Sequence, residues 1–278
     1  MKTSKTYVIT GSTSGIGYEA VKEFSKGNNV VFAGYRNPDL LERLNVLGDN
    51  VIPFYIDMYD DNSIVEAGQF IANKTKHVDT MFNIAGCVVA GAMENLDVNK
   101  LRKQFDVNTF SHIEFTQQLL RANLLENSKI INISSMASYA VFPYVAPYCA
   151  SKRALDILFN LMQVEYGNKI KVISVKPGVI ATPLWDKSIA GNQEILLNDK
   201  KYEKAYNYLK NNAHSNGQNG LNVKEVIKIL KKADTVKNPK TSYIVGSDAL
   251  VASIFSKLPQ GLITKILQLG IKLKIYKN

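Results

Sequence analysis

The sequence has few of the side chains that build metal centres or disulfide frameworks. Its 278 residues include only 2 cysteines and 3 histidines. Cys87 and Cys149 show neither a zinc-ligand spacing nor a disulfide pattern, and His77, His112 and His214 lie far apart. We therefore predict that the protein binds no metal.

Long apolar runs are also missing. No stretch reaches the roughly 18 consecutive apolar residues that a membrane-spanning helix needs. Met1–Lys5 leads directly into a short apolar segment, without the apolar core of a signal peptide. Together with the low cysteine content, these absences predict a cytoplasmic protein.

Acidic residues are scarce towards the end of the chain. The formal net charge is +10, and residues 198–278 hold 15 basic but only 5 acidic side chains, so residues 1–197 are balanced. A nucleic-acid-binding protein more often spreads basic residues over its main folded surface. We therefore expect no nucleic-acid partner, and a separate, local role for the basic end.

Short apolar runs alternate with helix-like stretches along most of the chain. Because these runs are continuously apolar, they are typical of parallel strands covered on both faces. The predicted strands are Tyr7–Thr10, Val30–Ala33, Val51–Asp57, Thr80–Asn83, Lys129–Ile133, Lys171–Lys176 and Thr241–Val245. The predicted helices cover residues 15–27, 39–47, 61–75, 98–125 and 148–167. This alternation predicts an α/β fold with one doubly wound parallel sheet and helices on both of its faces.

The regular alternation stops after the sixth predicted strand, where the next connection is far longer than a crossover needs. We place a substrate-lid insertion at about 183–221, in which the polar stretch Asn211–Gly220 is expected to be mobile. Asn222 followed by Glu225 predicts the start of the next helix. We divide the chain into one domain over residues 1–256 and a basic amphipathic segment over residues 257–278.

A glycine-rich turn connects the first strand to the first helix. It reads Thr10-Gly11-Ser12-Thr13-Ser14-Gly15-Ile16-Gly17. Such a turn lets backbone N–H groups approach a pyrophosphate at the positive end of a helix dipole. It predicts a dinucleotide site, although a glycine-rich turn can also serve only to pack a helix against a strand.

Arg36 lies just after the second strand. No carboxylate occupies the position that would hold the ribose 2′-hydroxyl of NAD. A guanidinium suits a 2′-phosphate instead, so we favour NADP(H) over NAD(H) as the coenzyme. The alternative is that Arg36 is a solvated loop residue.

Tyr148 and Lys152 are four residues apart, so they share one face of a helix. A nearby ammonium lowers the pKa of a phenol towards the working pH, as a general acid/base for a ketone–alcohol pair requires. Ser135 lies just past a strand end, where its hydroxyl could bind the substrate oxygen. The three side chains predict a site for hydride-transfer chemistry at a carbonyl or hydroxyl carbon.

Together these residues resemble the short-chain dehydrogenase/reductase family, which has a Rossmann-type fold and the T-G-x-x-x-G-I-G turn. The resemblance covers residues 5–185 and, more loosely, 222–250. It implies that Tyr148 donates or accepts the proton and that Lys152 lowers the pKa of Tyr148 and binds the nicotinamide ribose. It also implies that Ser135 orients the carbonyl, and that Asn108 positions a water in a relay to Lys152.

The same resemblance implies the coenzyme contacts. Asp57 and Met58 would contact the adenine, Asn83 would support the adenosine ribose, and Val179 and Thr182 would hold the nicotinamide amide. The full expected set is Gly11, Thr13, Ser14, Gly15, Ile16, Gly17, Arg36, Asp57, Met58, Asn83, Ala85, Gly86, Tyr148, Lys152, Pro177, Gly178, Val179 and Thr182. Members of the family are commonly dimers or tetramers, so a homo-oligomer is expected.

Apolar and aromatic side chains such as Trp185 and Tyr202 occur in the region expected to wall the substrate pocket, and residues 136–151 contain no Arg or Lys. Ile180–Trp185 also resembles hydroxysteroid and retinol dehydrogenase-like branches. We therefore expect a lipophilic ketone or secondary alcohol, such as a steroid, bile acid, retinoid or acyl-chain ketone.

Lys257–Lys277 mixes apolar and basic residues and contains no acid. A basic amphipathic helix suits the surface of an anionic membrane, and hence peripheral association. The alternatives are a pocket cover, a subunit contact or a solvated helix.

The sequence as a whole predicts an NADP(H)-dependent oxidoreductase acting on a lipophilic carbonyl or hydroxyl carbon. The competing interpretation is a non-catalytic dinucleotide-binding sensor, or a membrane-recruited scaffold, on the same fold.

Overall fold

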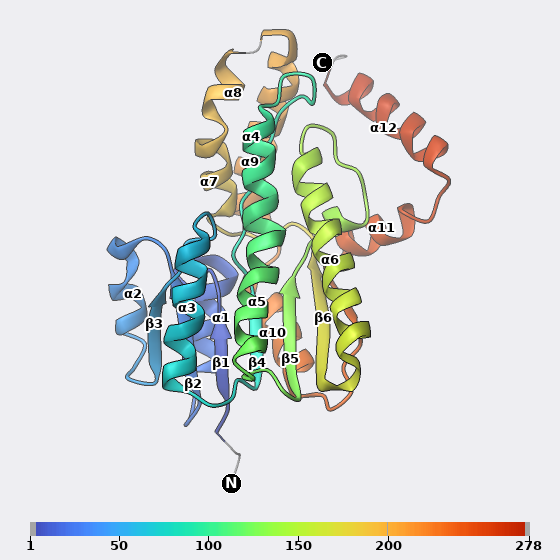
Figure 1. Cartoon of the computed structure of the whole chain (residues 1–278). Helices are drawn as coiled ribbons and strands as arrows, with labels where there is room; N and C mark the ends of the chain where they lie inside the picture. Colours follow the sequence, from blue (N-terminus) through green and yellow to red (C-terminus); the bar gives the residue numbers. More distant parts are fainter. Residues whose placement is uncertain (1–3, 199, 276–278) are drawn as a thin grey trace.

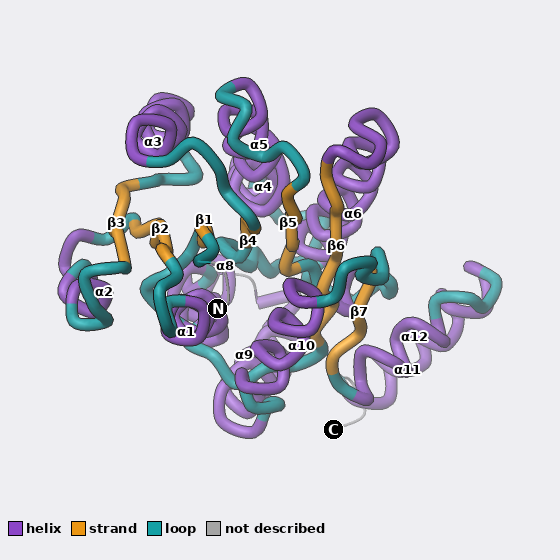
Figure 2. Tube along the Cα trace, turned by 90° about the horizontal axis from the view of Figure 1, so that it is seen from below, coloured by secondary structure: helices purple, strands orange, loops and turns teal. Residues whose placement is uncertain are grey.

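The computed structural model describes residues 4–198 and 200–275, and its seven strands form a single parallel sheet. The strand order is β3-β2-β1-β4-β5-β6-β7 (Figures 1 and 2). The strands are β1 Thr6–Ile9, β2 Val30–Tyr35, β3 Val51–Tyr55, β4 Thr80–Asn83, β5 Ser128–Ile133, β6 Ile170–Pro177 and β7 Ser242–Val245. The predicted doubly wound parallel sheet is confirmed.

Helices cover both faces of the sheet, as Figure 2 shows from below. One face carries α1 and α10, and the other carries α3, α5 and α6. The helices are α1 Gly15–Phe24, α2 Glu42–Asn45, α3 Asp61–Lys74, α4 Val98–Phe105, α5 Ser111–Arg121, α6 Ala146–Tyr166, α7 Leu184–Gly191, α8 Gln193–Asn198, α9 Glu203–Asn219, α10 Val223–Thr235, α11 Ser247–Phe255 and α12 Gln260–Lys274.

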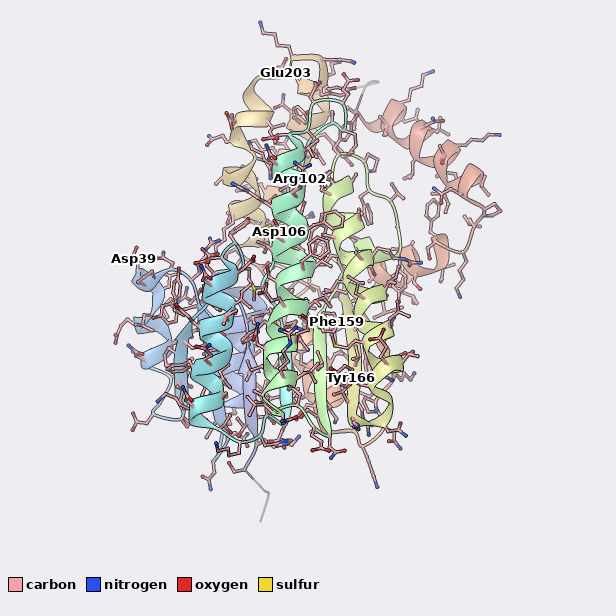
Figure 3. All side chains as sticks on the ribbon, viewed as in Figure 1. Asp39, Arg102, Asp106, Phe159, Tyr166 and Glu203 are labelled. Atoms are coloured by element: carbon pink, nitrogen blue, oxygen red, sulfur yellow. The ribbon has the colours of Figure 1, made fainter. Side chains whose placement is uncertain are left out.

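Two apolar cores explain why the strands are continuously apolar. Along β1, Tyr7 and Ile9 point into the core beneath α1 and α10, whereas Val8 points into the core beneath α3, α5 and α6. Side chains of a strand alternate between its faces, so a sheet covered on both sides needs an apolar residue at every position. Side chains fill both layers, with Phe159 of α6 completely buried (Figure 3).

Two predicted helices are shorter or interrupted. In place of a helix over residues 39–47, a 3₁₀ turn at Pro38–Leu40 precedes the four-residue α2, since Pro38 fits only the start of a helix. The predicted helix over residues 98–125 is divided into α4 and α5 by a π-helical turn at Asp106–Phe110. Such turns occur frequently at functional sites, and this one contains Asn108.

The prediction that Asn211–Gly220 is a mobile loop is wrong, because α9 continues to Asn219. Helix α9 packs against α7, where Gly217 lies close to Trp185. Ala205 and Tyr206 are buried at the other end of α9. Tertiary packing thus outweighs the low helix propensity of this polar stretch. The predicted start of the next helix is confirmed, since Asn222 caps α10 by accepting a hydrogen bond from the Lys224 N–H at 2.9 Å.

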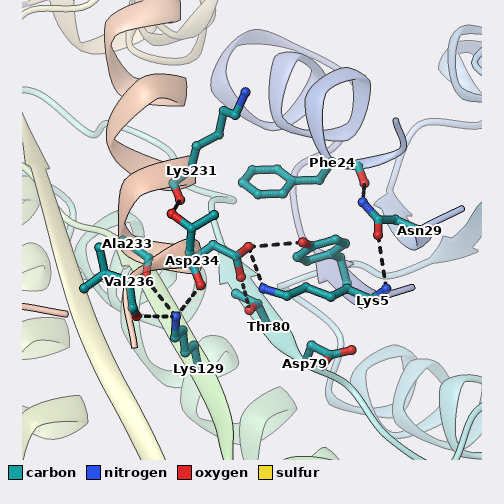
Figure 4. A network of polar contacts seen from close by, with 12 residues as sticks. Lys5, Phe24, Asn29, Asp79, Thr80, Lys129, Lys231, Ala233, Asp234 and Val236 are labelled. Carbon is teal, nitrogen blue, oxygen red and sulfur yellow. Dashed lines mark hydrogen bonds and ion pairs between the residues drawn. The ribbon is translucent and has the colours of Figure 1, made fainter. Parts of the chain in front are cut away.

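A buried polar network ties α10 to the end of the sheet opposite the carboxyl ends of the strands (Figure 4). The Asp234 carboxylate accepts hydrogen bonds from Lys5 Nζ at 2.9 Å, Tyr7 Oη at 3.1 Å and Thr80 Oγ1 at 2.7 Å. The Lys129 ammonium donates to the carbonyl of Val236 at 2.8 Å and also to that of Asp234. The Asp234 carboxylate, Tyr7 hydroxyl and Thr80 hydroxyl thus have partners within this network, which is consistent with a structural role.

Helices α11 and α12 lie at the margin of the molecule in both views, and Figure 2 shows them beyond β7 (Figures 1 and 2). Within the described residues, no helix has the length and apolar character needed to cross a bilayer. Residues 276–278 of the predicted C-terminal segment and residue 199 of the predicted lid lie outside the described residues. Homo-oligomerisation stays a prediction.

Candidate active site

The glycine-rich turn lies where the strand order reverses, between β1 and β4, at the carboxyl ends of the strands. Ligands of open α/β sheets bind at this position. Gly11 has φ +68°, and a Cβ on it would lie 3.0 Å from the backbone of Ala85. A Cβ on Gly17 would lie 2.1 Å from the Gly11 carbonyl oxygen. Side chains are therefore excluded from a cradle whose backbone can approach a pyrophosphate.

Thr10 holds this cradle against the loop after β4. Its Oγ1 accepts hydrogen bonds from the Ile84 N–H at 2.9 Å and the Ala85 N–H at 3.2 Å. Thr10 is part of the predicted turn, but this structural role was not predicted. The available signal in the sequence was a hydroxyl residue immediately before the first glycine.

The start of α1 faces the segment that follows β6. Ser14 precedes α1 but makes no side-chain capping bond, and its Oγ instead accepts from Lys187 Nζ of α7 at 3.1 Å. A Cβ on Gly15, which has φ +55°, would lie 3.3 Å from Thr182 Cβ. Ile16 lines the cavity described below, and Thr13 is half-buried in the turn. The predicted coenzyme residues of the turn and Thr182 are thus brought together.

A cluster of cations surrounds this turn. Arg36 is exposed just beyond β2, with its guanidinium carbon 5.8 Å from the centre of the Tyr59 ring. Burial, followed by the charges of Arg36 and Arg43, lowers the pKa of Lys187. Three cations close enough to affect one another favour an anion between them. Lys187, in the predicted lid, was missed because only the fold brings it to the turn.

Asp57 and Met58 form a turn at the end of β3. Asp57 Oδ1 accepts from the Tyr59 N–H at 3.0 Å, and the Met58 carbonyl accepts from Ser111 Oγ at 2.7 Å. Their polar groups therefore hold the local backbone in this structure. An adenine contact from either residue stays a prediction.

The residues after β4 connect the coenzyme cradle to the catalytic side chains. Asn83 is buried and donates from Nδ2 to Asn132 Oδ1 on β5 at 2.8 Å, so it ties two strands together. A Cβ on Gly86 would lie 3.3 Å from Asn108 Oδ1 and 3.6 Å from Lys152 Nζ. Gly86 therefore lets the chain pass close to both side chains.

Ser135 and Tyr148 meet at the base of the cavity. Ser135 lies after β5 and accepts from the Ala137 N–H at 3.1 Å. Burial raises the pKa of the Tyr148 phenol to about 12, while its hydrogen bond with Ser135 acts in the lowering direction. The predicted lowering of this pKa by Lys152 is therefore not seen in this structure, because burial dominates. Ser135 and Tyr148 both line the cavity, and their predicted roles towards a substrate oxygen stay predictions.

Lys152 and Asn108 lie behind this pair. Burial lowers the pKa of Lys152 to about 8, while Asp156 opposes that shift. Lys152 Nζ donates to the Ile133 carbonyl at 2.8 Å. Asn108 Nδ2 donates to Ser151 Oγ at 3.0 Å and to the Cys87 carbonyl at 3.0 Å, while its Oδ1 accepts from the Cys87 N–H at 2.9 Å. These bonds fix the π-helical turn beside Lys152.

The segment after β6 closes one side of the site. The Gly178 N–H donates to the Val245 carbonyl at 2.8 Å, directly after Pro177 at the end of β6. The Val179 N–H donates to Asp248 Oδ2 at 2.7 Å, and the Val179 carbonyl accepts from the Leu221 N–H at 2.9 Å. Both backbone groups of Val179 thus have protein partners. An anchoring role for Val179 towards the nicotinamide amide stays a prediction.

Asp248 and Asn192 position the site without having been predicted. A Cβ on Gly178 would lie 1.9 Å from Asp248 Oδ1, so Asp248 can approach only because residue 178 is glycine. Asn192 is buried between α7 and α8, donates to the Val88 carbonyl at 2.9 Å and accepts from the Ala90 N–H at 2.9 Å. Each contact joins segments more than 60 residues apart, which no local pattern reveals.

A cavity of about 720 Å³ extends from Ser135 and Tyr148 to α12. Apolar and aromatic side chains make up most of its wall, including Val88, Phe142, Leu184, Trp185, Tyr208 and Leu267. Lys210 is its one charged lining residue within the described parts of the chain, and it is exposed. Among the described residues, no cluster of three or more His, Cys, Asp or Glu side chains is placed to hold a metal.

A nucleotide-sized glycine cradle beside a Ser–Tyr–Lys set, on a doubly wound parallel sheet, defines a dinucleotide-dependent oxidoreductase of the Rossmann type. The family model described as short chain dehydrogenase matches residues 5–193. The chain therefore belongs to the short-chain dehydrogenase/reductase family.

Similarity to individual proteins extends over nearly the whole chain. A probable short-chain type dehydrogenase/reductase of Helicobacter pylori is 31% identical, over 91% of this chain and 92% of its own. An NADPH-dependent 3-dehydrocapnine reductase of Ornithobacterium rhinotracheale is 26% identical, over 95% and 96%. A Burkholderia phymatum short-chain dehydrogenase/reductase solved in complex with NAD superimposes with a TM-score of 0.78 at 17% identity, over 91% and 92%. The structural match shows the fold, while the hydroxysteroid or retinol branch stays a prediction.

Proposed function

We propose that the protein is an NADP(H)-dependent oxidoreductase for lipophilic ketones and secondary alcohols, such as steroids, bile acids, retinoids or acyl-chain ketones. The observation that carries the proposal is that Ser135 and Tyr148 both line a largely apolar cavity of about 720 Å³. The cavity wall favours an apolar substrate body, and the paired hydroxyl groups supply polar contacts for one oxygen.

The chain's own groups suit proton transfer to that oxygen. When bound, the nicotinamide supplies or accepts the hydride. In ketone reduction, Ser135 holds the substrate oxygen by a hydrogen bond and Tyr148 donates its phenolic proton to that oxygen. A proton from water then restores the phenol. The family resemblance gives Lys152 the role of stabilising the phenolate and Asn108 that of positioning the water.

The cations around the glycine-rich turn support NADP(H) as the coenzyme. Arg36 and Lys187 carry positive charge towards the place where the cradle would hold phosphates. The similar reductase of Ornithobacterium rhinotracheale is NADPH-dependent by name, whereas the similar Burkholderia structure contains NAD. The proposed preference for NADP(H) therefore rests on the cations of this chain around the glycine-rich turn.

A coenzyme-coupled screen of steroid, bile-acid, retinoid and fatty ketones with NADPH or NADH tests the reaction. We expect Tyr148→Phe to lower the reduction rate by about 10²-fold or more, because the proton donor is lost. NADPH binding, followed by fluorescence titration, should change by less than about twofold. Near-normal turnover by Tyr148→Phe would make the mechanism wrong. NADPH binding without turnover of any compound would favour a non-catalytic sensor instead.

The coenzyme preference has its own test. Arg36→Asp should raise the Kd for NADPH by about 10²-fold and leave NADH less affected, because a carboxylate repels the 2′-phosphate. Arg121→Asp, at an exposed end of α5, is the matched control for an added negative charge. An unchanged ratio of the two dissociation constants would reject the assignment of Arg36.

A further inference from the structure

Helix α12 has an inner face that belongs to the substrate cavity. Ile263 and Ile275 are buried on this face. Ile266, Leu267, Gly270 and Ile271 line the cavity that begins at Ser135 and Tyr148. The helix therefore forms the outer wall of the cavity, and its position is set by packing.

The outer face of α12 is apolar and exposed. Leu262, Leu269 and Leu273 have exposed fractions of 45%, 56% and 44%, and Ile266, which also borders the cavity, is 42% exposed. With 3.6 residues per turn, these four side chains form one stripe along the helix. Such a stripe is unusual on a solvated helix, because exposing its apolar surface to water is unfavourable. Contact with another apolar surface or with lipid removes that exposure.

Lysines border this stripe. Lys265 and Lys272 are exposed and lie within about a quarter turn of its centre. No acidic residue follows Asp248 in the sequence, and neither lysine forms an ion pair within the part of the chain that the structure describes. An acid-free apolar stripe beside lysines is the pattern of a helix lying in a bilayer interface.

We propose that this outer face, defined by Leu262, Ile266, Leu269 and Leu273 with Lys265 and Lys272, docks on the surface of an anionic bilayer. A second copy of the chain fits less well, because pairing two such faces would bring lysines together without an acid between them. The neighbouring helix α11 adds exposed aliphatic side chains at the same margin of the molecule, namely Leu250, Val251 and Ile254. The stripe and the cavity wall are two faces of one helix, so a docked molecule would hold its cavity beside the lipid phase.

Vesicle co-sedimentation of the full chain tests this surface independently of the proposed reaction. We expect binding to vesicles of phosphatidylglycerol and phosphatidylcholine, and loss of that binding on pure phosphatidylcholine or in about 0.5 M salt. Leu262→Ser/Leu269→Ser should lower the partition coefficient by about tenfold or more. Lys265→Gln/Lys272→Gln should lower it by about fivefold for each charge removed.

The control is Val46→Ser/Val236→Ser, which removes two exposed aliphatic side chains far from α12 in the sequence and should leave vesicle binding unchanged. NADPH binding and thermal unfolding show that each variant is folded. Equal vesicle binding by all variants, or no binding to anionic vesicles, would overturn the proposal. The proposal would also be overturned if the unaltered chain did not bind vesicles and Leu262→Ser/Leu269→Ser had half its molar mass in solution. That result would show that the face mediates self-association. Vesicle binding without ketone turnover would count against the proposed reaction alone.

Discussion

At the scale of single residues, Lys152 is a candidate catalytic group whose charge changes just above neutral pH. Its pKa of about 8 places deprotonation just above neutral pH, whereas Tyr148, at about 12, stays protonated throughout that range. Lys152 is charged below its pKa and neutral above it. The family resemblance gives the charged form the role of binding the nicotinamide ribose.

We therefore expect kcat/KM for NADPH, which reports the free enzyme, to fall above pH about 8. The decline should approach about tenfold per pH unit, because a single proton is lost. Steady-state rates between pH 6 and 10 measure it. In Lys152→Arg the guanidinium keeps its charge over this pH range. The decline in kcat/KM above pH about 8 should therefore be absent from the activity that the variant retains. If kcat/KM of this variant still declined above pH about 8, a group other than Lys152 would be responsible for the pH dependence.

At the scale of elements, a buried ion pair joins α6 to β6 behind the catalytic residues. Lys176 Nζ lies 2.7 Å from Asp156 Oδ2, and both side chains are almost fully buried. The Lys176 ammonium also lies 4.1 Å from the centre of the Tyr139 ring. Asp156 is one turn from Lys152 on α6, so the pair adjoins the helix face that carries the catalytic lysine.

Removing one partner leaves an uncompensated buried charge. We expect Asp156→Asn to lower the free energy of unfolding by about 3–5 kcal/mol in urea denaturation. The double variant Asp156→Leu/Lys176→Met should recover most of that loss, since it removes both charges and keeps the volume filled. A loss below about 1 kcal/mol in the single variant would show that the pair is solvated or replaceable.

The elements also show which parts of the fold can be predicted from sequence. The strands were predictable because a sheet covered on both faces needs apolar residues at every strand position, as Tyr7, Val8 and Ile9 show. That Ser135 and Tyr148 line one cavity was predictable because both lie in one short stretch of the chain, whereas their catalytic roles stay predictions. The helical state of Asn211–Gly220 was not, because it depends on packing against Trp185 from another segment. Asp248 and Asn192 act through contacts across the fold, which no local pattern contains.

At the scale of the whole molecule, the neutral and basic parts of the chain meet at the cavity. Residues 1–197 supply the glycine cradle and the catalytic side chains, while α9 and α12 of the basic part supply the far wall. The length of the cavity is therefore set by elements remote in sequence from the reacting oxygen. If the substrate has a long apolar body, its far end lies against α12.

Gly270 allows this arrangement to be tested. It lines the cavity, and a Cβ built on it meets no other heavy atom within 4 Å. Gly270→Leu should fill part of the outer cavity without strain and should favour the helix. We expect kcat/KM for long acyl-chain ketones to fall by about tenfold, with short ketones changed by less than about twofold, because only the long chains reach α12.

Gly261→Leu is the matched control on the same helix, since a Cβ there also meets nothing within 4 Å and Gly261 does not line the cavity. It should leave both classes of ketone unaffected. An equal loss for short and long ketones in Gly270→Leu would point to a general disturbance of α12. No loss for either class would mean that the substrate body takes another direction, away from the C-terminal helix.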